Sequence, residues 1–124
     1  MGRVLLVGLG GCVGSMGRYW LAGVVQAWSG VGFPAGTLAV NVVGSFVLGL
    51  VMALSLERAM IGPDARLLLA VGVCGGFTTM STFSYETLAL VRDGSVLAAC
   101  ANAGASVGAS VLAVWAGMVL GRLV

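Results

Sequence analysis

The sequence contains no histidine and no lysine, and only 8% of its 124 residues are charged. Metal centres of the zinc or haem type need histidine or clustered cysteine at short spacing. The only cysteines, Cys12, Cys74 and Cys100, lie far apart in apolar segments, and their odd number argues against a disulfide framework. The sequence therefore excludes these metal sites, and we expect the three thiols to be small core residues.

The scarcity of charge also limits the partners and the chemistry. The 6 basic residues are scattered arginines that form no cluster, so nucleic acid is not an expected partner. Without histidine or lysine, the chain lacks the usual bases that activate a nucleophile. The sequence therefore predicts no enzymatic activity.

Long uncharged runs dominate what is present, and 60% of the residues are hydrophobic. These runs cover residues 4–17, 19–56, 67–85 and 94–121. Runs of about 20 apolar residues are typical of membrane spans. We therefore expect one all-α membrane domain over residues 1–124, with four transmembrane helices. Their expected bounds are about 4–28, 36–56, 67–91 and 95–120. The first segment lacks the short apolar region and cleavage site of a signal peptide, so we expect it to be retained.

The third segment is unusual, because residues 75–86 bring two glycines and six hydroxyl side chains into an apolar span. Glycine lowers helix propensity by about 1 kcal/mol relative to alanine. Irregular backbone at membrane depth is tolerated only where it is buried in protein or lines a water-filled cavity. We therefore expect a helix break over residues 75–79, of the kind whose carbonyls and amides coordinate ions. A kinked helix with close contacts is the alternative interpretation.

Neutral polar residues recur on two other spans. Asn41 is the only amide of the second span, and Asn102, Ser106 and Ser110 recur every four residues on one face of the fourth. Their structural role would be interhelical hydrogen bonds. Their functional role would be a line of donors for a small anion that sheds water and moves between several weak sites. No carboxylate lies at mid-span, so proton-coupled transport is unsupported.

Two features of the first span have different explanations. Gly10 and Gly14 have the spacing that lets helices approach closely. Arg18 lies well inside the segment, where an arginine faces a partner or a wet cavity, or extends to the lipid headgroups beside Tyr19 and Trp20. If Arg18 faces water, it forms a vestibule that attracts anions. In the third span, Phe83 has a positive ring edge that would stabilise an anion weakly, although packing alone would also explain it.

These motifs resemble those of the Fluc (CrcB) fluoride channel family, in order and over essentially the whole chain. The matching pieces are Gly10-Gly11-Cys12-Val13-Gly14 with Arg18-Tyr19, Gly36-Thr37-Leu38-Ala39-Val40-Asn41, Gly75-Gly76-Phe77-Thr78-Thr79-Met80-Ser81-Thr82-Phe83-Ser84, and Gly104-Ala105-Ser106. The motif of the third span is specific, whereas the glycine motifs are not.

The resemblance implies an antiparallel, dual-topology homodimer in the bacterial inner membrane, with two pores that export fluoride passively. It also implies a structural Na⁺ at the dimer interface, held by the backbone carbonyls of Gly75 and Thr78. The fluoride ion, the membrane lipid and a second copy of the chain would be the partners. The implied fluoride pathway consists of Asn41, Met80, Ser81, Thr82, Phe83, Asn102, Ser106 and Ser110.

Two residues depart from the pattern that the resemblance implies. Met80 stands where the family usually has the first of two phenylalanines, and Asn102 stands where an aromatic residue can occur. A thioether is polarizable and lacks a ring quadrupole. We therefore expect the pathway to persist with an altered rate or an altered coordination of the ion.

Two other classes of membrane protein fit the sequence less well, and its charges favour one orientation only weakly. A small proton-coupled multidrug transporter would need a carboxylate in residues 4–28, which contain none. A structural membrane-assembly protein would explain the glycines but not the polar lines. The arginines slightly favour both termini on the cytoplasmic side, and their number is small enough that copies could insert either way.

Overall fold

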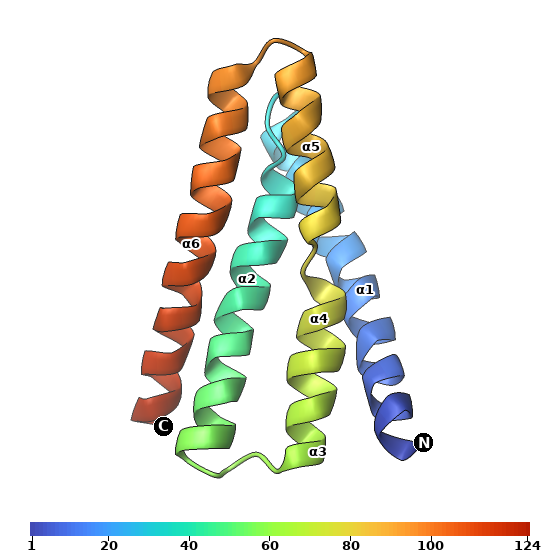
Figure 1. Ribbon diagram of the computed structural model, residues 1–124, viewed down its shortest axis with the longest axis vertical. Coiled ribbons are helices and arrows are strands. Elements are labelled where there is room, and N and C mark those ends of the chain that lie inside the picture. The colour runs from blue at the N-terminus through green and yellow to red at the C-terminus, as the bar shows by residue number, and fades with distance from the viewer.

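The computed structural model covers residues 1–124 and consists of four long helical segments, each antiparallel to the next one in the chain (Figure 1). The first is α1 and the last is α6. The second is α2 followed by the π-helical turns of η1, and the third consists of α3, the π-helical η2, α4 and α5. The bounds are α1 Gly2–Ser29, α2 Ala35–Met52, η1 Ala53–Glu57, α3 Pro63–Arg66, η2 Leu67–Cys74, α4 Gly75–Phe77, α5 Met80–Arg92 and α6 Val96–Leu123.

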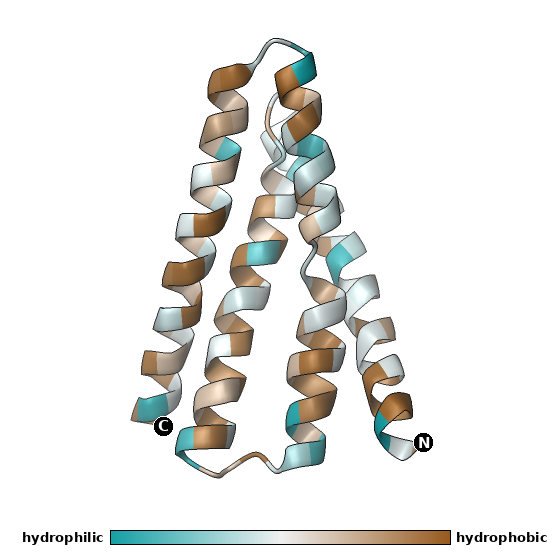
Figure 2. Ribbon diagram, in the orientation of Figure 1, coloured by the Kyte–Doolittle hydropathy of each residue, from teal (hydrophilic) through white to brown (hydrophobic).

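All four segments are long and apolar enough to cross a membrane, at 28, 23, 30 and 28 residues. The four expected segments are therefore present as helices, with ends that differ by only a few residues from the predicted ones. Apolar turns cover most of each helix, and the strongly hydrophilic turns are few (Figure 2). Because the number of segments is even, both termini lie at the same end of the molecule (Figure 1).

Glycines bring α1 against the third segment. A Cβ atom added at Gly10 or Gly14 would overlap the backbone of η2, and one added at Gly76 would overlap the backbone of Gly11. The predicted close packing at Gly10 and Gly14 is confirmed. Helices in lipid have little hydrophobic drive to associate, so such close backbone contact is a main source of their packing.

A second glycine contact joins α2 to α6. A Cβ atom at Gly49 would overlap the carbonyl of Val114, and one at Gly117 would overlap the carbonyl of Phe46. In contrast, a Cβ atom added at Gly104 or Gly108 of α6 would meet nothing within 4 Å. The side of α6 that carries these two glycines is therefore left open.

The helical backbone of the third segment stops at Thr78 and Thr79. Both residues are extended, with ψ of 158° at Thr78 and 111° at Thr79, and α5 starts at the next residue. The predicted start of the break at Gly75 is wrong, because Gly75 and Gly76 are the first two residues of α4. Gly76 serves the close approach to α1 rather than the unwinding.

The cysteines only partly follow the prediction. Cys74 is buried, whereas Cys12 and Cys100 are exposed on the outer faces of α1 and α6. The expectation that all three are core residues is therefore wrong for two of them. The physical reason is that four single helices bury few side chains, so most of each helix surface faces outward.

Candidate ion pathway at the helix break

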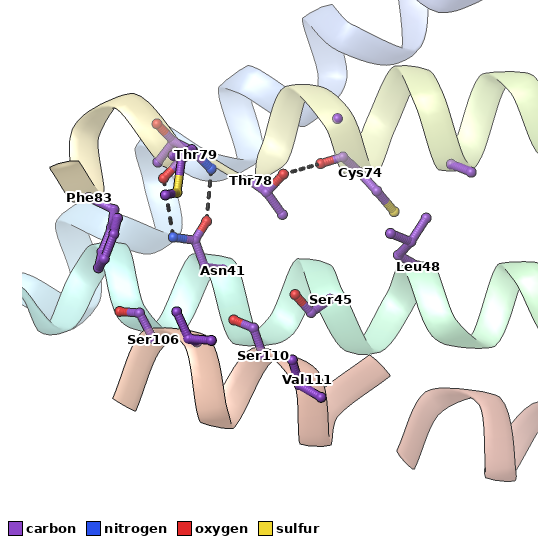
Figure 3. Close-up of a pocket in the computed structure, with 14 residues that line it drawn as sticks. Asn41, Ser45, Leu48, Cys74, Thr78, Thr79, Phe83, Ser106, Ser110 and Val111 are labelled. Carbon is purple, nitrogen blue, oxygen red and sulfur yellow. Dashed lines mark hydrogen bonds between the residues drawn. The ribbon is translucent and has the colours of Figure 1, made fainter. Parts of the chain in front are cut away.

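The amide side chain of Asn41 bridges from α2 to the break. Its Nδ2 donates to the carbonyl of Thr79 at 3.2 Å, and its Oδ1 accepts from the backbone N–H of Thr79 at 2.8 Å (Figure 3). One side chain therefore satisfies both backbone polar groups of an extended residue. Such groups need partners at membrane depth, since no water reaches them in the hydrocarbon core.

These bonds take two donors away from the helix. In a continuous helix the N–H of Thr79 would donate to the carbonyl of Gly75, and the N–H of Thr82 would donate to the carbonyl of Thr78. Here the N–H of Thr79 donates to Asn41, and that of Thr82 donates to the hydroxyl of Thr79 at 3.3 Å. The carbonyls of Gly75 and Thr78 thus lack their helical donors. The resemblance implied these same two carbonyls as ion ligands.

A cavity of about 420 Å³ lies beside the break, between α2, the third segment and α6. The cavity has no charged residue in its lining, and hydroxyl and amide groups supply its polar atoms. In Figure 3, Asn41 and Ser45 project from α2, while Ser106 and Ser110 project from α6. The predicted site residues in its lining are Asn41, Gly75, Thr78, Met80, Phe83, Ser106 and Ser110.

The two side chains of the expected aromatic pair differ in exposure. Phe83 is buried, with 9% of its surface exposed, whereas Met80 is 70% exposed. Both line the cavity, but Met80 does so from its open edge.

A second cavity, of about 470 Å³, lies on the other side of the break. It is charged, since both Arg18 and Glu86 line it, together with Thr37 and Thr82. Thr79 lines both cavities, so the extended residue separates a neutral cavity from a charged one. Arg18 is half-buried here, in agreement with the interpretation in which it faces a cavity.

Thr37 and Glu86 were missed as site residues by the sequence analysis. The hydroxyl of Thr37 donates to Oε1 of Glu86 at 3.0 Å, and Oε2 of Glu86 is buried without a partner. The signal that could have found Glu86 is its position as a carboxylate inside a span, since such residues are functional by default. Thr37 could be found only through the tertiary contact.

Asn102 and Ser81 line neither cavity. Asn102 is only 1% exposed, and its Nδ2 donates to the hydroxyl of Thr87 at 2.9 Å. Thr87 in turn donates to the carbonyl of Phe83 at 2.7 Å, so this chain of bonds ties the turn that carries Phe83 to α6. Ser81 is exposed, and its hydroxyl lies 3.4 Å from that of Thr79.

The fold and the site together define a small helical membrane protein with a neutral polar cavity beside a break in its third segment. Residues 5–118 match the family model described as CrcB-like protein, Camphor Resistance (CrcB). The chain belongs to the CrcB family.

Curated relatives carry a more specific name. The chain is 46% identical to the fluoride-specific ion channel FluC of Geobacter sulfurreducens over 98% of both chains. It is 59% identical to a FluC of Thermus thermophilus over 77% of this chain and 76% of that one. It is 46% identical to FluC of Chlorobaculum tepidum over 99% of this chain and 97% of that one.

Proposed function

We propose that this protein is a fluoride channel that lets the ion leave the bacterial cytoplasm passively across the inner membrane. The observation that carries the proposal is the neutral cavity beside the break, lined by Asn41, Ser106 and Ser110. The relatives named as fluoride-specific channels support the choice of ion. Fluoride enters cells as HF and is trapped inside as the ion, so a passive pathway is sufficient to lower its concentration.

The neutrality of the cavity suits conduction. A buried arginine would hold an anion in a deep well, whereas conduction requires binding that is strong enough to enter and weak enough to leave. Hydroxyl and amide donors replace part of the water that a small anion loses, without a fixed charge. The second Nδ2 hydrogen of Asn41 remains for this purpose, because the first is used by Thr79.

The break supplies electrostatic asymmetry. A helix carries partial positive charge at its N-terminal end and partial negative charge at its C-terminal end. The N-terminal end of α5 and the C-terminal end of α4 meet at Thr78 and Thr79. The first favours an anion and the second a cation, as at the discontinuous helices of transporters.

A structural Na⁺ is part of the proposal. The carbonyls of Gly75 and Thr78 fit such an ion, since both lack their helical donors and oxygen atoms from unwound backbone coordinate Na⁺ elsewhere. The bound cation would supply positive charge that offsets the repulsion between nearby anions. No cluster of acidic or cysteine ligands is needed for it.

We further propose an antiparallel homodimer in which two chains of opposite topology meet along the open side of the break. Gly75 is exposed and a Cβ added there would contact nothing, while Met80 and the glycines at 104 and 108 are also uncovered. A second copy would cover these residues and would bring two breaks together around one cation. Arg18 would then attract anions to the charged cavity at each entrance.

Efflux from liposomes tests the function. Liposomes that contain the purified protein should release fluoride at least 100-fold faster than chloride, measured with ion-selective electrodes (~100-fold corresponds to about 2.7 kcal/mol). The reason is that a small pathway admits the smaller ion, and its hydroxyl and amide donors replace the water that fluoride loses. Protein-free liposomes are the control. Equal release of both ions would refute the proposal, and fluoride release that requires a proton gradient would favour a coupled transporter.

A further inference from the structure

The contacts of Asn41 suggest a role beyond lining the anion pathway. We propose that Asn41 is a positioning residue of the cation site, because its amide holds the backbone of Thr79 and so keeps the carbonyl of Gly75 free of its helical donor. The hydroxyl of Thr79 does the same for the carbonyl of Thr78. This inference rests on the Na⁺ site of the proposed function.

A continuous third helix is the structure that competes with the break. If Thr79 were helical, its N–H would return to the carbonyl of Gly75 and the third segment would become continuous through the break. Backbone groups in an apolar environment must be bonded, so an unpaired N–H at Thr79 would favour this rewinding. The Oδ1 atom of Asn41, at 2.8 Å, removes that tendency by accepting the N–H.

The helix that carries Asn41 is held rigidly by its neighbours. Asn41 lies on α2, which is fixed against α6 by the backbone contacts of Gly49 and Gly117. At its N-terminal end, α2 is further held by Gln26, whose Oε1 accepts from the N–H of Gly36 at 3.2 Å. The amide therefore approaches Thr79 from a helix with little freedom to follow a rewound third segment.

The side chain of Thr79 also stabilises the break. Its hydroxyl accepts from the N–H of Thr82 at 3.3 Å and donates to the hydroxyl of Thr82 at 2.9 Å. A side-chain oxygen at this N-cap position is what takes the N–H of Thr82 from the carbonyl of Thr78. Serine would retain this bond, whereas valine would lose it without changing the shape of the side chain much.

The test measures sodium binding rather than transport. Purified protein in detergent is unfolded by heat over a NaCl series, with ionic strength held constant by N-methyl-D-glucamine chloride and unfolding followed by tryptophan fluorescence. For Asn41→Ala, the Na⁺ concentration that gives half of the stabilisation should rise at least tenfold above that of the parent. Ser45→Ala is the matched control, because Ser45 lies one turn further on the same face, lines the same cavity and makes no side-chain hydrogen bond.

Three further variants make the test specific. Asn41→Asp keeps the acceptor for the N–H of Thr79, so its Na⁺ midpoint should not rise even if it conducts no fluoride. Thr79→Val should raise the midpoint and Thr79→Ser should leave it within twofold of the parent, and this pair decides the matter if Asn41→Ala does not fold. The inference would be overturned if the Na⁺ midpoint of Asn41→Ala or Thr79→Val equalled that of the parent. It would also be overturned if Ser45→Ala shifted the midpoint as much as these variants do. If Na⁺ did not stabilise the parent protein at all, both this inference and the proposed cation site would be refuted. The proposed fluoride channel function would not be affected, because fluoride efflux is measured separately.

Discussion

The two halves of the third segment are held in place by different kinds of contact. The half before the break, Pro63–Phe77, packs against α1 through glycines whose backbones touch. The half after it, α5, is joined to its neighbours by side-chain hydrogen bonds: Asn41 to Thr79, Thr37 to Glu86 and Asn102 to Thr87. The change from one kind of contact to the other falls at Thr78 and Thr79.

This difference explains where an ion pathway is able to form. Backbone contact between glycines leaves no room for a ligand, and it gives the first half a fixed position. Hydroxyl and amide groups keep spare donors and acceptors after they have bonded the protein, so the second half is able to exchange bonds with an ion. The proposed pathway therefore runs along the hydrogen-bonding side chains around the second half, not along the glycine contacts of the first half.

The largest effect should come from placing a side chain in the glycine contact between α1 and the first half of the third segment. In Gly14→Leu, the new side chain would overlap the carbonyl of Val73 and the N–H of Phe77, which are backbone atoms that cannot move aside. Because overpacking of ordinary cores already costs about 1–3 kcal/mol, we expect a cost of at least about 3 kcal/mol. The yield of monodisperse protein in size-exclusion chromatography should fall to background.

Gly8→Leu is the control for this prediction, because a Cβ at Gly8 of the same helix contacts nothing. It should yield nearly as much monodisperse protein as the parent. Normal yield from Gly14→Leu would mean that α1 and the third segment do not lie as close as described.

The next largest effect should come from a charge placed among the side-chain hydrogen bonds that hold the second half. Asn41→Asp places a carboxylate on the neutral cavity, where two unit charges about 4 Å apart repel by about 4 kcal/mol at an effective dielectric constant of 20. Fluoride efflux from liposomes should therefore fall roughly 10³-fold, since about 1.36 kcal/mol corresponds to a factor of ten. The protein should still elute as the parent does. Normal efflux would mean that Asn41 does not line the fluoride pathway.

Much of the backbone-contact half could be predicted from the sequence. Long apolar runs located all four segments, and the spacing of Gly10 and Gly14 indicated a close helix contact, whose partner, η2, only the structure identifies. The position of the break was predicted less well, because Gly75 and Gly76 suggested unwinding. In the structure both are helical. A glycine that permits close approach and a glycine that unwinds a helix look the same in a sequence.

The polar half depended on contacts that no local pattern contains. Asn41 was expected in the pathway, but the residue that it bonds, Thr79, is 38 residues further along the chain, so no local pattern predicts the pair. The contact between Thr37 and Glu86 spans 49 residues and was not foreseen. The π-helical turns of η2 also lack a sequence signature, since they arise from how the segment fits its neighbours.

A smaller effect should come from removing the two side-chain hydrogen bonds of Asn102, to Thr87 and from Ser106. Asn102→Leu removes the donor to Thr87 and the acceptor for Ser106, while it keeps the branched shape and the number of heavy atoms of this buried side chain. Interhelical hydrogen bonds in membrane proteins contribute about 0.6 kcal/mol on average. The apparent melting temperature should therefore fall by only a few degrees, and fluoride efflux should stay within threefold of the parent. Cys100→Ala, at an exposed position of the same helix, should change neither quantity. A loss of efflux as large as that of Asn41→Asp would place Asn102 in the pathway itself.

The smallest effect should come from the exposed edge of the cavity. Met80→Phe exchanges two large apolar side chains at a position that is 70% exposed, and volume-conserving exchanges usually cost less than about 1.5 kcal/mol. The added ring offers a positive edge, so fluoride efflux should remain close to that of the parent. Phe83→Ile is the comparison, because it removes the buried ring from the lining and should lower efflux at least tenfold, which corresponds to about 1.4 kcal/mol. Both variants are measured in matched liposomes after their elution in size-exclusion chromatography has been checked. If Phe83→Ile conducted normally while Met80→Phe did not, these two side chains would not form the expected pair along the pathway.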